Sequence, residues 1–233
     1  MSCVAIIPAR GGSKRLPRKN ILEICGQPAI AYPIDCALHC GLFERIIVST
    51  EDNEVATTAK NHGAEVLSRP HHLSTDKATV RQVARHVLSE LKVFKRFPET
   101  FCIIYPTAVL LEPYHLFESE KLLNDTAIDA VLAVKKLNPH PYKALKIDDG
   151  RLEPLFHENF LKKGQELIPY FAPAGAFHWM RSRAFLDAGQ SVWQLHRTYY
   201  ILKSYESVDI DDQEDFEMAK RLLIARKTIS NHP

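Results

Sequence analysis

The sequence predicts an α/β protein with a mostly parallel sheet, and three observations lead to this prediction. Short apolar runs typical of buried strands alternate with stretches whose apolar residues recur at helical spacing. A cation-rich loop with two adjacent glycines follows the first of these runs, where ligands bind in such sheets. The chain has 233 residues, of which 45% are hydrophobic, enough for one substantial core. We therefore expect residues 1–233 to form a single domain.

The first half of the chain repeats a strand–helix rhythm. Glycines mark two helix ends: Gly41 after residues 29–40 and Gly63 after residues 55–62. Short apolar runs between these helices predict strands at 4–7, 46–49 and 65–67. A strand–helix–strand rhythm of this kind favours parallel pairing with helices on both faces of the sheet.

The second half continues the rhythm around one interruption. Residues 78–91 are strongly amphipathic and predict a helix, with Thr75 or Asp76 near its N-cap. The wholly apolar run 101–105 predicts a central strand. Further elements are expected as follows: helices at 113–123 and after Asp212, strands at 129–134, 174–179 and 198–202, and a loop at 186–190.

Between residues 135 and 175 the rhythm changes. Turn residues and short alternating stretches replace the strand–helix pattern, and Asp149–Gly150 predicts a hairpin turn. We expect this excursion to form a small subdomain or a dimerisation arm.

The loop after the first strand has the composition of a phosphate site. It reads IPARGGSKRLPRKN over residues 7–20, where Gly11 and Gly12 let the backbone approach a ligand closely. Backbone N–H groups and cations together hold phosphate oxygens. The plain alternative is a solvated basic loop, but crowded like charges repel one another unless an anion binds. The five cations are Arg10, Lys14, Arg15, Arg18 and Lys19.

An acidic segment near the C-terminus could supply a metal site. It reads SVDIDD over residues 207–212, and on a strand end Asp209 and Asp211 would point to one side. Two carboxylates together with phosphate oxygens commonly hold Mg²⁺ beside a nucleotide. The alternative role, capping the last helix, is expected of Asp212 and stays open for Asp209.

Bulk properties exclude several classes. The net charge of +2 does not indicate nucleic-acid binding, and no run of eighteen apolar residues predicts a membrane span. The first residues enter a strand at once and lack the pattern of a signal peptide. The five scattered cysteines form no CxxC pair. Reduced thiols in a cytoplasmic protein are the expectation.

Four ordered segments resemble the acylneuraminate cytidylyltransferases, the enzymes that make CMP-activated sialic acids. The segments are IPARGGSKRLPRKN, GLFERIIVSTEDNEVATTAKNHGAEVLSRPHHLSTD, HPYKALKIDDG and SVDIDDQEDFEMA, and together they extend over nearly the whole chain. The resemblance implies a Rossmann-like nucleotidyltransferase fold and a homodimer contacted through the excursion. It also implies transfer of CMP from CTP, with Mg²⁺, to the anomeric hydroxyl of a nonulosonic acid.

The resemblance also implies roles for individual residues. Arg10, Lys14, Lys19 and Asp211 would be catalytic, and Asp209 and Asp211 would hold Mg²⁺. Lys143 would face the acidic end of the sugar or the phosphates. The implied nucleotide-binding residues are Ala9, Arg10, Gly11, Gly12, Ser13, Lys14, Lys19, Asn20, Arg69 and Asp76, and the implied sugar-binding residues are Tyr105, Thr107, Lys143, Gln165 and Gly175. Arg15 and Arg18 are expected only to support the loop or to contact solvent.

The expected sugar pocket departs from the sialic-acid pattern. Tyr105 and Leu111 stand where that pattern has glutamine and arginine, and Ala172 and Ala174 replace arginine and asparagine. A less polar pocket suits a less polar sugar. The tyrosine and the segment GQELIPYFAPAG are more similar to the branch that activates pseudaminic acid, although Pro173 departs from that branch as well.

Several alternatives remain. The sugar could instead be N-acetylneuraminate, legionaminate or Kdo. A nucleotide-sugar glycosyltransferase also combines such a sheet with an Asp-x-Asp pair, but there the pair usually lies mid-chain. A non-catalytic nucleotide-binding module would not need both the phosphate loop and the acidic pair.

Overall fold

A computed structural model describes residues 2–95, 97–189 and 192–230. Its core is a seven-stranded sheet in the order β11-β7-β10-β6-β1-β4-β5. Only β10 runs antiparallel to its neighbours β6 and β7, so the sheet is mostly parallel as predicted. The strands of this sheet are β1 (Cys3–Pro8), β4 (Arg45–Thr50), β5 (Glu65–Ser68), β6 (Thr100–Ile104), β7 (Ala130–Lys136), β10 (Phe171–Arg181) and β11 (Arg197–Leu202).

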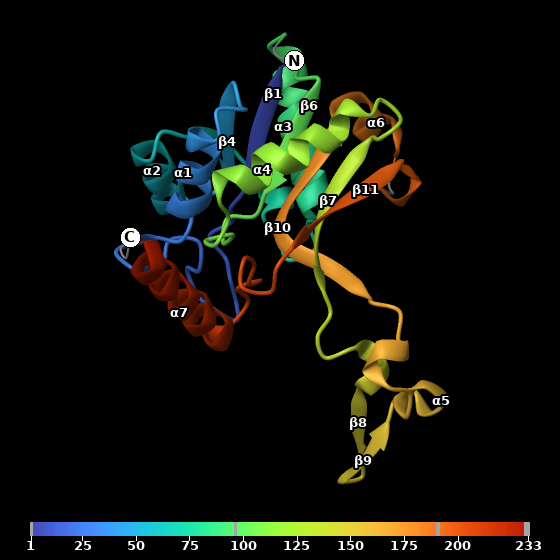
Figure 1. Ribbon diagram of the computed structural model, residues 1–233. Helices are drawn as coiled ribbons and strands as arrows, with labels where there is room; N and C mark the ends of the chain where they lie inside the picture. Colours follow the sequence, from blue (N-terminus) through green and yellow to red (C-terminus); the bar gives the residue numbers. More distant parts are fainter. Residues whose placement is uncertain (1, 96, 190–191, 231–233) are drawn as a thin grey trace.

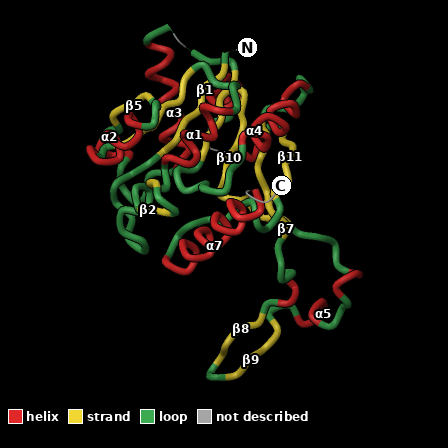
Figure 2. Tube along the Cα trace, turned by 60° about the vertical axis from the view of Figure 1, so that its left-hand side comes forward, coloured by secondary structure: helices red, strands yellow, loops and turns green. Residues whose placement is uncertain are grey.

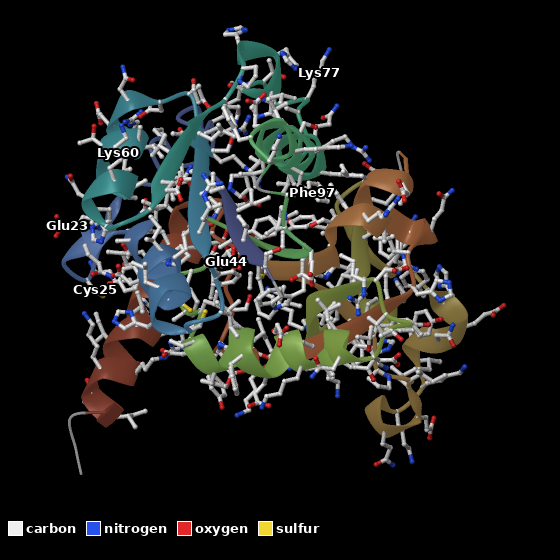
Figure 3. The ribbon with its side chains drawn as sticks, turned by 90° about the horizontal axis from the view of Figure 1, so that it is seen from above. Glu23, Cys25, Glu44, Lys60, Lys77 and Phe97 are labelled. Atoms are coloured by element: carbon white, nitrogen blue, oxygen red, sulfur yellow. The ribbon has the colours of Figure 1, made fainter. Side chains whose placement is uncertain are left out.

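Helices cover both faces of the sheet (Figure 1). One core layer lies between the sheet and the helices α1 (Ala31–His39), α2 (Asn53–Asn61) and α4 (Pro113–Glu120). The other lies beneath α3 (Val80–Val93) and α6 (Ser182–Asp187). Side chains fill the space between the sheet and the helices on each of its faces (Figure 3). The predicted central strand, β6, is fully buried and occupies the middle position of the sheet.

The last helix, α7 (Gln213–Ser230), packs apart from these two layers against the basic loop. A third core cluster joins Phe216 and Ala219 of α7 to Leu16 of the loop and Ile24 of a small hairpin. That hairpin pairs β2 (Glu23–Ile24) with β3 (Gln27–Pro28). The basic loop is therefore held between the sheet and the C-terminal helix.

An arm leaves the body between β7 and β10, and Figures 1 and 2 both show it extending away from the sheet. It holds the hairpin of β8 (Leu145–Asp148) and β9 (Arg151–Pro154), with Asp149 and Gly150 at the predicted turn. A short helix, α5 (His157–Phe160), follows. The arm comprises fewer residues than the expected 135–175 excursion, because the residues at both ends of that range belong to the main sheet.

Two local predictions were wrong. Helix α3 begins after Thr79, whose side chain forms a capping box with Gln82, and not after Thr75 or Asp76. Part of the expected loop at 186–190 belongs to α6, while its last residue lies outside the described residues. Within the described residues, no helix is both long enough and apolar enough to cross a membrane.

Candidate active site

The basic loop leaves the carboxyl end of β1 and is fastened to its neighbour β4. The Ala9 N–H donates to the Ser49 carbonyl at 3.0 Å. Asn20 is buried, and its side-chain amide donates to the Arg10 carbonyl at 2.8 Å. Asn20 therefore contacts the loop, and its expected contact with a nucleotide stays a prediction.

Gly11 lies where a side chain would not fit. A Cβ atom at this position would lie 2.9 Å from the Cβ of Asp52, the residue that caps α2. The Gly11 N–H donates to Glu51 at 2.8 Å. The first glycine of the pair thus lets the loop approach the start of α2, whereas Gly12 has open space around it.

The loop cations are paired with carboxylates of the chain itself. Arg10 and Lys14 both contact Asp76, at 2.6 and 2.5 Å, and hold its pKa below the usual range. Arg18 forms ion pairs with Asp52 at 2.5 Å and Glu54 at 2.6 Å. The expectation that these charges would repel one another without a bound anion was therefore wrong. The protein's own acids supply the compensating charge.

The other two loop cations meet the acidic segment. Lys19 lies 3.1 Å from Asp211, and Arg15 lies 2.7 Å from it. Lys19 also donates to the Ile210 carbonyl at 2.8 Å. Burial alone would raise the pKa of Asp211. The hydrogen bonds and charges of Lys19 and Arg15 outweigh this effect and hold that pKa below its usual value. Arg18 supports the loop as expected, whereas Arg15 reaches a predicted metal ligand.

Asp209 approaches β10 at Gly175. This glycine has a φ of +64°, and a Cβ on it would lie 2.7 Å from the carboxylate carbon of Asp209. Desolvation and the nearby charge of Asp211 raise the pKa of Asp209. The segment is not part of a strand, so the geometry assumed for the pair was wrong, although the two carboxylates do lie near each other. Asp212 caps α7 by accepting from the Asp215 N–H at 3.0 Å, as predicted.

The predicted sugar residues of the main body gather beside this acidic segment. Tyr105 follows β6, and its ring meets His178 of β10 edge-on at 5.7 Å between centroids. Burial, and secondarily the charge of Asp209, raises the pKa of Tyr105. Thr107, which follows Tyr105 after one intervening proline, is buried as well. His178 was not singled out from the sequence, because a lone histidine in an apolar strand carries no distinctive pattern.

Arg69 is buried at the carboxyl ends of β4 and β5. It donates to the Ser49 carbonyl at 2.5 Å, and burial lowers its pKa. The same carbonyl accepts the Ala9 N–H, so Arg69 lies directly beneath the basic loop. The expected contact of Arg69 with a nucleotide stays a prediction.

Lys143 and Gln165 lie in the arm, apart from the other predicted site residues (Figure 1). Both line a hollow of about 510 Å³. The Lys143 ammonium donates to the carbonyls of Phe160 and, at 2.6 Å, Lys162. Within one chain these contacts keep Lys143 in the arm, and its expected contact with sugar or phosphate stays a prediction.

The carboxyl end of this sheet thus carries a basic loop, a carboxylate pair and the ring contact between Tyr105 and His178. Clustered cations suit phosphate groups, and the two carboxylates suit a divalent ion that bridges to phosphate. The fold and the site together define a nucleotide-dependent transferase of the α/β class.

The chain belongs to the cytidylyltransferase family, whose model matches residues 4–228. It is therefore a CTP-utilising nucleotidyltransferase. It is 31% identical to a pseudaminic acid cytidylyltransferase of Campylobacter jejuni over 95% of this chain and 96% of that protein. It is 32% identical to an N-acylneuraminate cytidylyltransferase of Escherichia coli over 93% of this chain and 51% of that protein.

Solved structures agree on the fold. A CMP:2-keto-3-deoxy-manno-octonic acid synthetase complexed with CTP superposes with a TM-score of 0.74 over 97% of this chain and all of that chain. A 4-diphosphocytidyl-2C-methyl-D-erythritol synthase of Anaerococcus prevotii superposes with a TM-score of 0.62. With 16% and 12% identity, these likenesses confirm the nucleotidyltransferase fold alone.

Proposed function

We propose that the protein transfers CMP from CTP to the anomeric C2 hydroxyl of a nonulosonic acid. The bond from the sugar oxygen to the α-phosphorus forms, the bond from the α-phosphorus to the bridging oxygen breaks, and pyrophosphate leaves. The hydroxyl proton passes to solvent. The observation that carries the proposal is the juxtaposition of the basic loop and the acidic segment through Lys19 and Arg15, which contact Asp211.

The loop is proposed to bind the triphosphate by exchanging ion pairs. Arg10 and Lys14 now share Asp76, and phosphate oxygens would take the place of that carboxylate. Lys19 would neutralise charge that develops on the leaving pyrophosphate. The Gly12 N–H would supply a neutral donor, whereas the N–H groups of Gly11 and Ser13 already donate to Glu51 and to the Gly11 carbonyl. In this arrangement the chain positions the reactants and compensates charge, and forms no covalent bond with them.

Asp209 and Asp211 are proposed to hold Mg²⁺, and their chemistry fits this ion. Within the described residues, no group of three or more His, Cys, Asp or Glu side chains could hold a metal ion. Two carboxylates are nevertheless the usual protein share when substrate phosphates complete the coordination of Mg²⁺. Desolvation, and after it the nearby charge of Asp211, raises the pKa of Asp209, and a bound cation would stabilise both carboxylates. Bound Mg²⁺ would polarise the α-phosphate and acidify the attacking hydroxyl.

The proposed sugar is pseudaminic acid or a related bacterial nonulosonic acid. Tyr105 and the alanines at 172 and 174 leave this side of the pocket without the arginine and amides of the sialic-acid pattern. His178 adds a neutral group, because burial lowers its pKa to about 4. N-acetylneuraminate, legionaminate and Kdo are the competing sugars.

We further propose a homodimer that forms through the arm. The arm exposes large apolar side chains: Leu145, Ile147, Leu152, Leu161 and Ile168 have exposed fractions of 49 to 88%. Exposed apolar surface of this kind marks an interaction site. A charged substitution, Ile147→Asp, should shift the mass measured by sedimentation from dimer to monomer, whereas Lys60→Asp on α2 should not. A wild-type protein that sediments as a monomer would contradict the proposal.

The cytoplasm is the proposed location. All five cysteines are free, and burial raises the pKa of the Cys36 and Cys102 thiols, which keeps them protonated. Reduced thiols suit a reducing compartment.

The decisive experiment is an assay of pyrophosphate release from CTP with a panel of free nonulosonic acids and Mg²⁺. We expect release with pseudaminic acid, at a higher kcat/KM than with N-acetylneuraminate. Omitting the sugar and replacing CTP by ATP are the controls. If no nonulosonic acid supports pyrophosphate release, the proposed reaction is wrong.

A further inference from the structure

The acidic segment has no regular secondary structure of its own. Residues 207–211 belong neither to a helix nor to a strand, so backbone ladders do not fix the positions of Asp209 and Asp211. Side-chain contacts must do so instead. Two residues at its start, Glu206 and Ser207, are both buried and both polar.

Glu206 is fastened to the turn before it and to α4. Its carboxylate accepts from the Lys203 N–H at 2.8 Å and from the Tyr114 hydroxyl at 3.1 Å. The Lys203 ammonium lies 3.5 Å away. Only 7% of Glu206 is exposed, and these donors compensate the buried charge. The next residue, Ser207, donates through its hydroxyl to the Ala174 carbonyl, immediately before Gly175.

His115 of α4 completes the surroundings of Glu206. Its Nδ1 accepts from the Glu112 N–H at 3.0 Å, so in the neutral imidazole the proton is on Nε2. That Nε2 lies 3.6 Å from the Glu206 carboxylate and has no hydrogen-bond partner among the described residues. Burial lowers the pKa of His115 to about 4, which keeps the ring neutral. The hydrogen bond from the Glu112 N–H to Nδ1, at the start of α4, thus places the buried Nε2–H of His115 beside Glu206.

We propose that Glu206, oriented by His115, is a positioning residue for the metal-binding carboxylates. It fixes the start of the acidic segment to α4 while Ser207 fixes it to β10. Together they place Asp209 at Gly175 and Asp211 at Lys19. The inference rests on the proposed function of Asp209 and Asp211. It adds that helix α4, which holds no predicted site residue, determines how well they bind the metal.

The first test measures metal binding directly, without turnover. Mn²⁺ is titrated into the protein with CTP present and sugar absent, and free Mn²⁺ is followed by electron paramagnetic resonance. Glu206→Gln puts an amide group where donors now converge and should raise the Mn²⁺ dissociation constant about 10-fold, as loss of an outer partner of a metal ligand commonly does. The same variant should lower kcat without changing KM for the sugar.

A second pair of variants tests the role of the imidazole. His115→Gln keeps an N–H that can face Glu206 and should bind Mn²⁺ nearly as the wild type does. His115→Phe removes that N–H and should resemble Glu206→Gln. This pair decides the matter even if Glu206→Gln does not fold.

Trp179→Phe is the matched control. It deletes another buried hydrogen bond to α4, from the indole N–H to the Ser119 hydroxyl at 2.9 Å, away from the acidic segment. If Glu206→Gln and His115→Phe bind Mn²⁺ no more weakly than this control, the positioning role is overturned. If the wild type itself binds no Mn²⁺ in the presence of CTP, the metal site has failed and not the positioning role.

Discussion

Replacing Gly175 by alanine should weaken metal-dependent activity far more than it weakens the fold. Gly175 has a φ of +64° and lies against Asp209. Alanine there has two separate effects. One is the strain of a left-handed backbone, and the other is the collision of its Cβ with the Asp209 carboxylate.

The two effects differ in size. The left-handed conformation costs about 1–2 kcal/mol for a residue with a Cβ, which lowers Tm by about 2–8 °C in a domain of this length. The new Cβ would lie 2.7 Å from the Asp209 carboxylate carbon. Carbon atoms pack at about 3.5–4.0 Å, so the carboxylate must move by about 1 Å. A displacement of that size in a reacting group costs about 100-fold in rate.

Gly41→Ala separates the two effects. Gly41 has a similar φ of +69°, but a Cβ on it would meet nothing within 4 Å. Thermal unfolding should therefore show similar losses in Tm for both variants. Pyrophosphate release across an Mg²⁺ titration should be lost only in Gly175→Ala. If Gly175→Ala keeps the activity of Gly41→Ala, Asp209 does not act from the position described.

Three further predictions concern charge. Asp211→Ala should abolish Mg²⁺-dependent pyrophosphate release, and full turnover in this variant would mean that the metal is held elsewhere. Asp76→Asn should lower KM for CTP by about two- to fivefold, because it removes a competitor of phosphate for Arg10 and Lys14; a higher KM would show that Asp76 contacts the nucleotide itself. His178 has a pKa lowered to about 4, against about 6.5 in the unfolded chain, so only the unfolded state binds its proton in that window. The titration of His178 should thus lower the stability by about 2 kcal/mol between pH 7 and pH 5 in urea titrations, so His178→Phe should lose about that much less than the wild type over the same range. His115, whose pKa is also lowered to about 4, acts in the same direction in both proteins.

The sheet could be predicted from the sequence because its strands are local and apolar. The central strand, the hairpin turn at Asp149–Gly150 and the cap at Asp212 all depend on residues adjacent in the chain. The sequence also held the signal for the start of α3, since Thr79 and Gln82 form a capping-box pattern, but Thr75 or Asp76 was expected near the cap instead. Short elements such as α6 carry too few residues for a periodic signal.

The composition of the basic loop pointed to the candidate site, but the sequence did not show which acids pair with the cations of the loop. Five cations in one loop pointed to an anion, yet the acids that pair with them lie far along the chain, Asp76 at 66 positions from Arg10. No local pattern indicates such a partner. The place of Lys143 relative to the loop could not be predicted either, because the arm that carries it is held by contacts of its own, such as the donation from Lys143 to the Lys162 carbonyl.

The ion pairs around the loop affect how the protein should respond to salt. A loop with five uncompensated cations would bind a triphosphate with an affinity that falls steeply as ionic strength rises. In the proposed exchange, each phosphate contact made by Arg10 or Lys14 would replace a contact with Asp76 that is itself half-exposed and screened. Salt would weaken the ion pairs with Asp76 in the free protein and the contacts with phosphate in the complex alike. Much of the effect of salt on affinity would therefore cancel. The occupancy of the proposed nucleotide site should therefore depend less on ionic strength than that of a loop with unpaired cations.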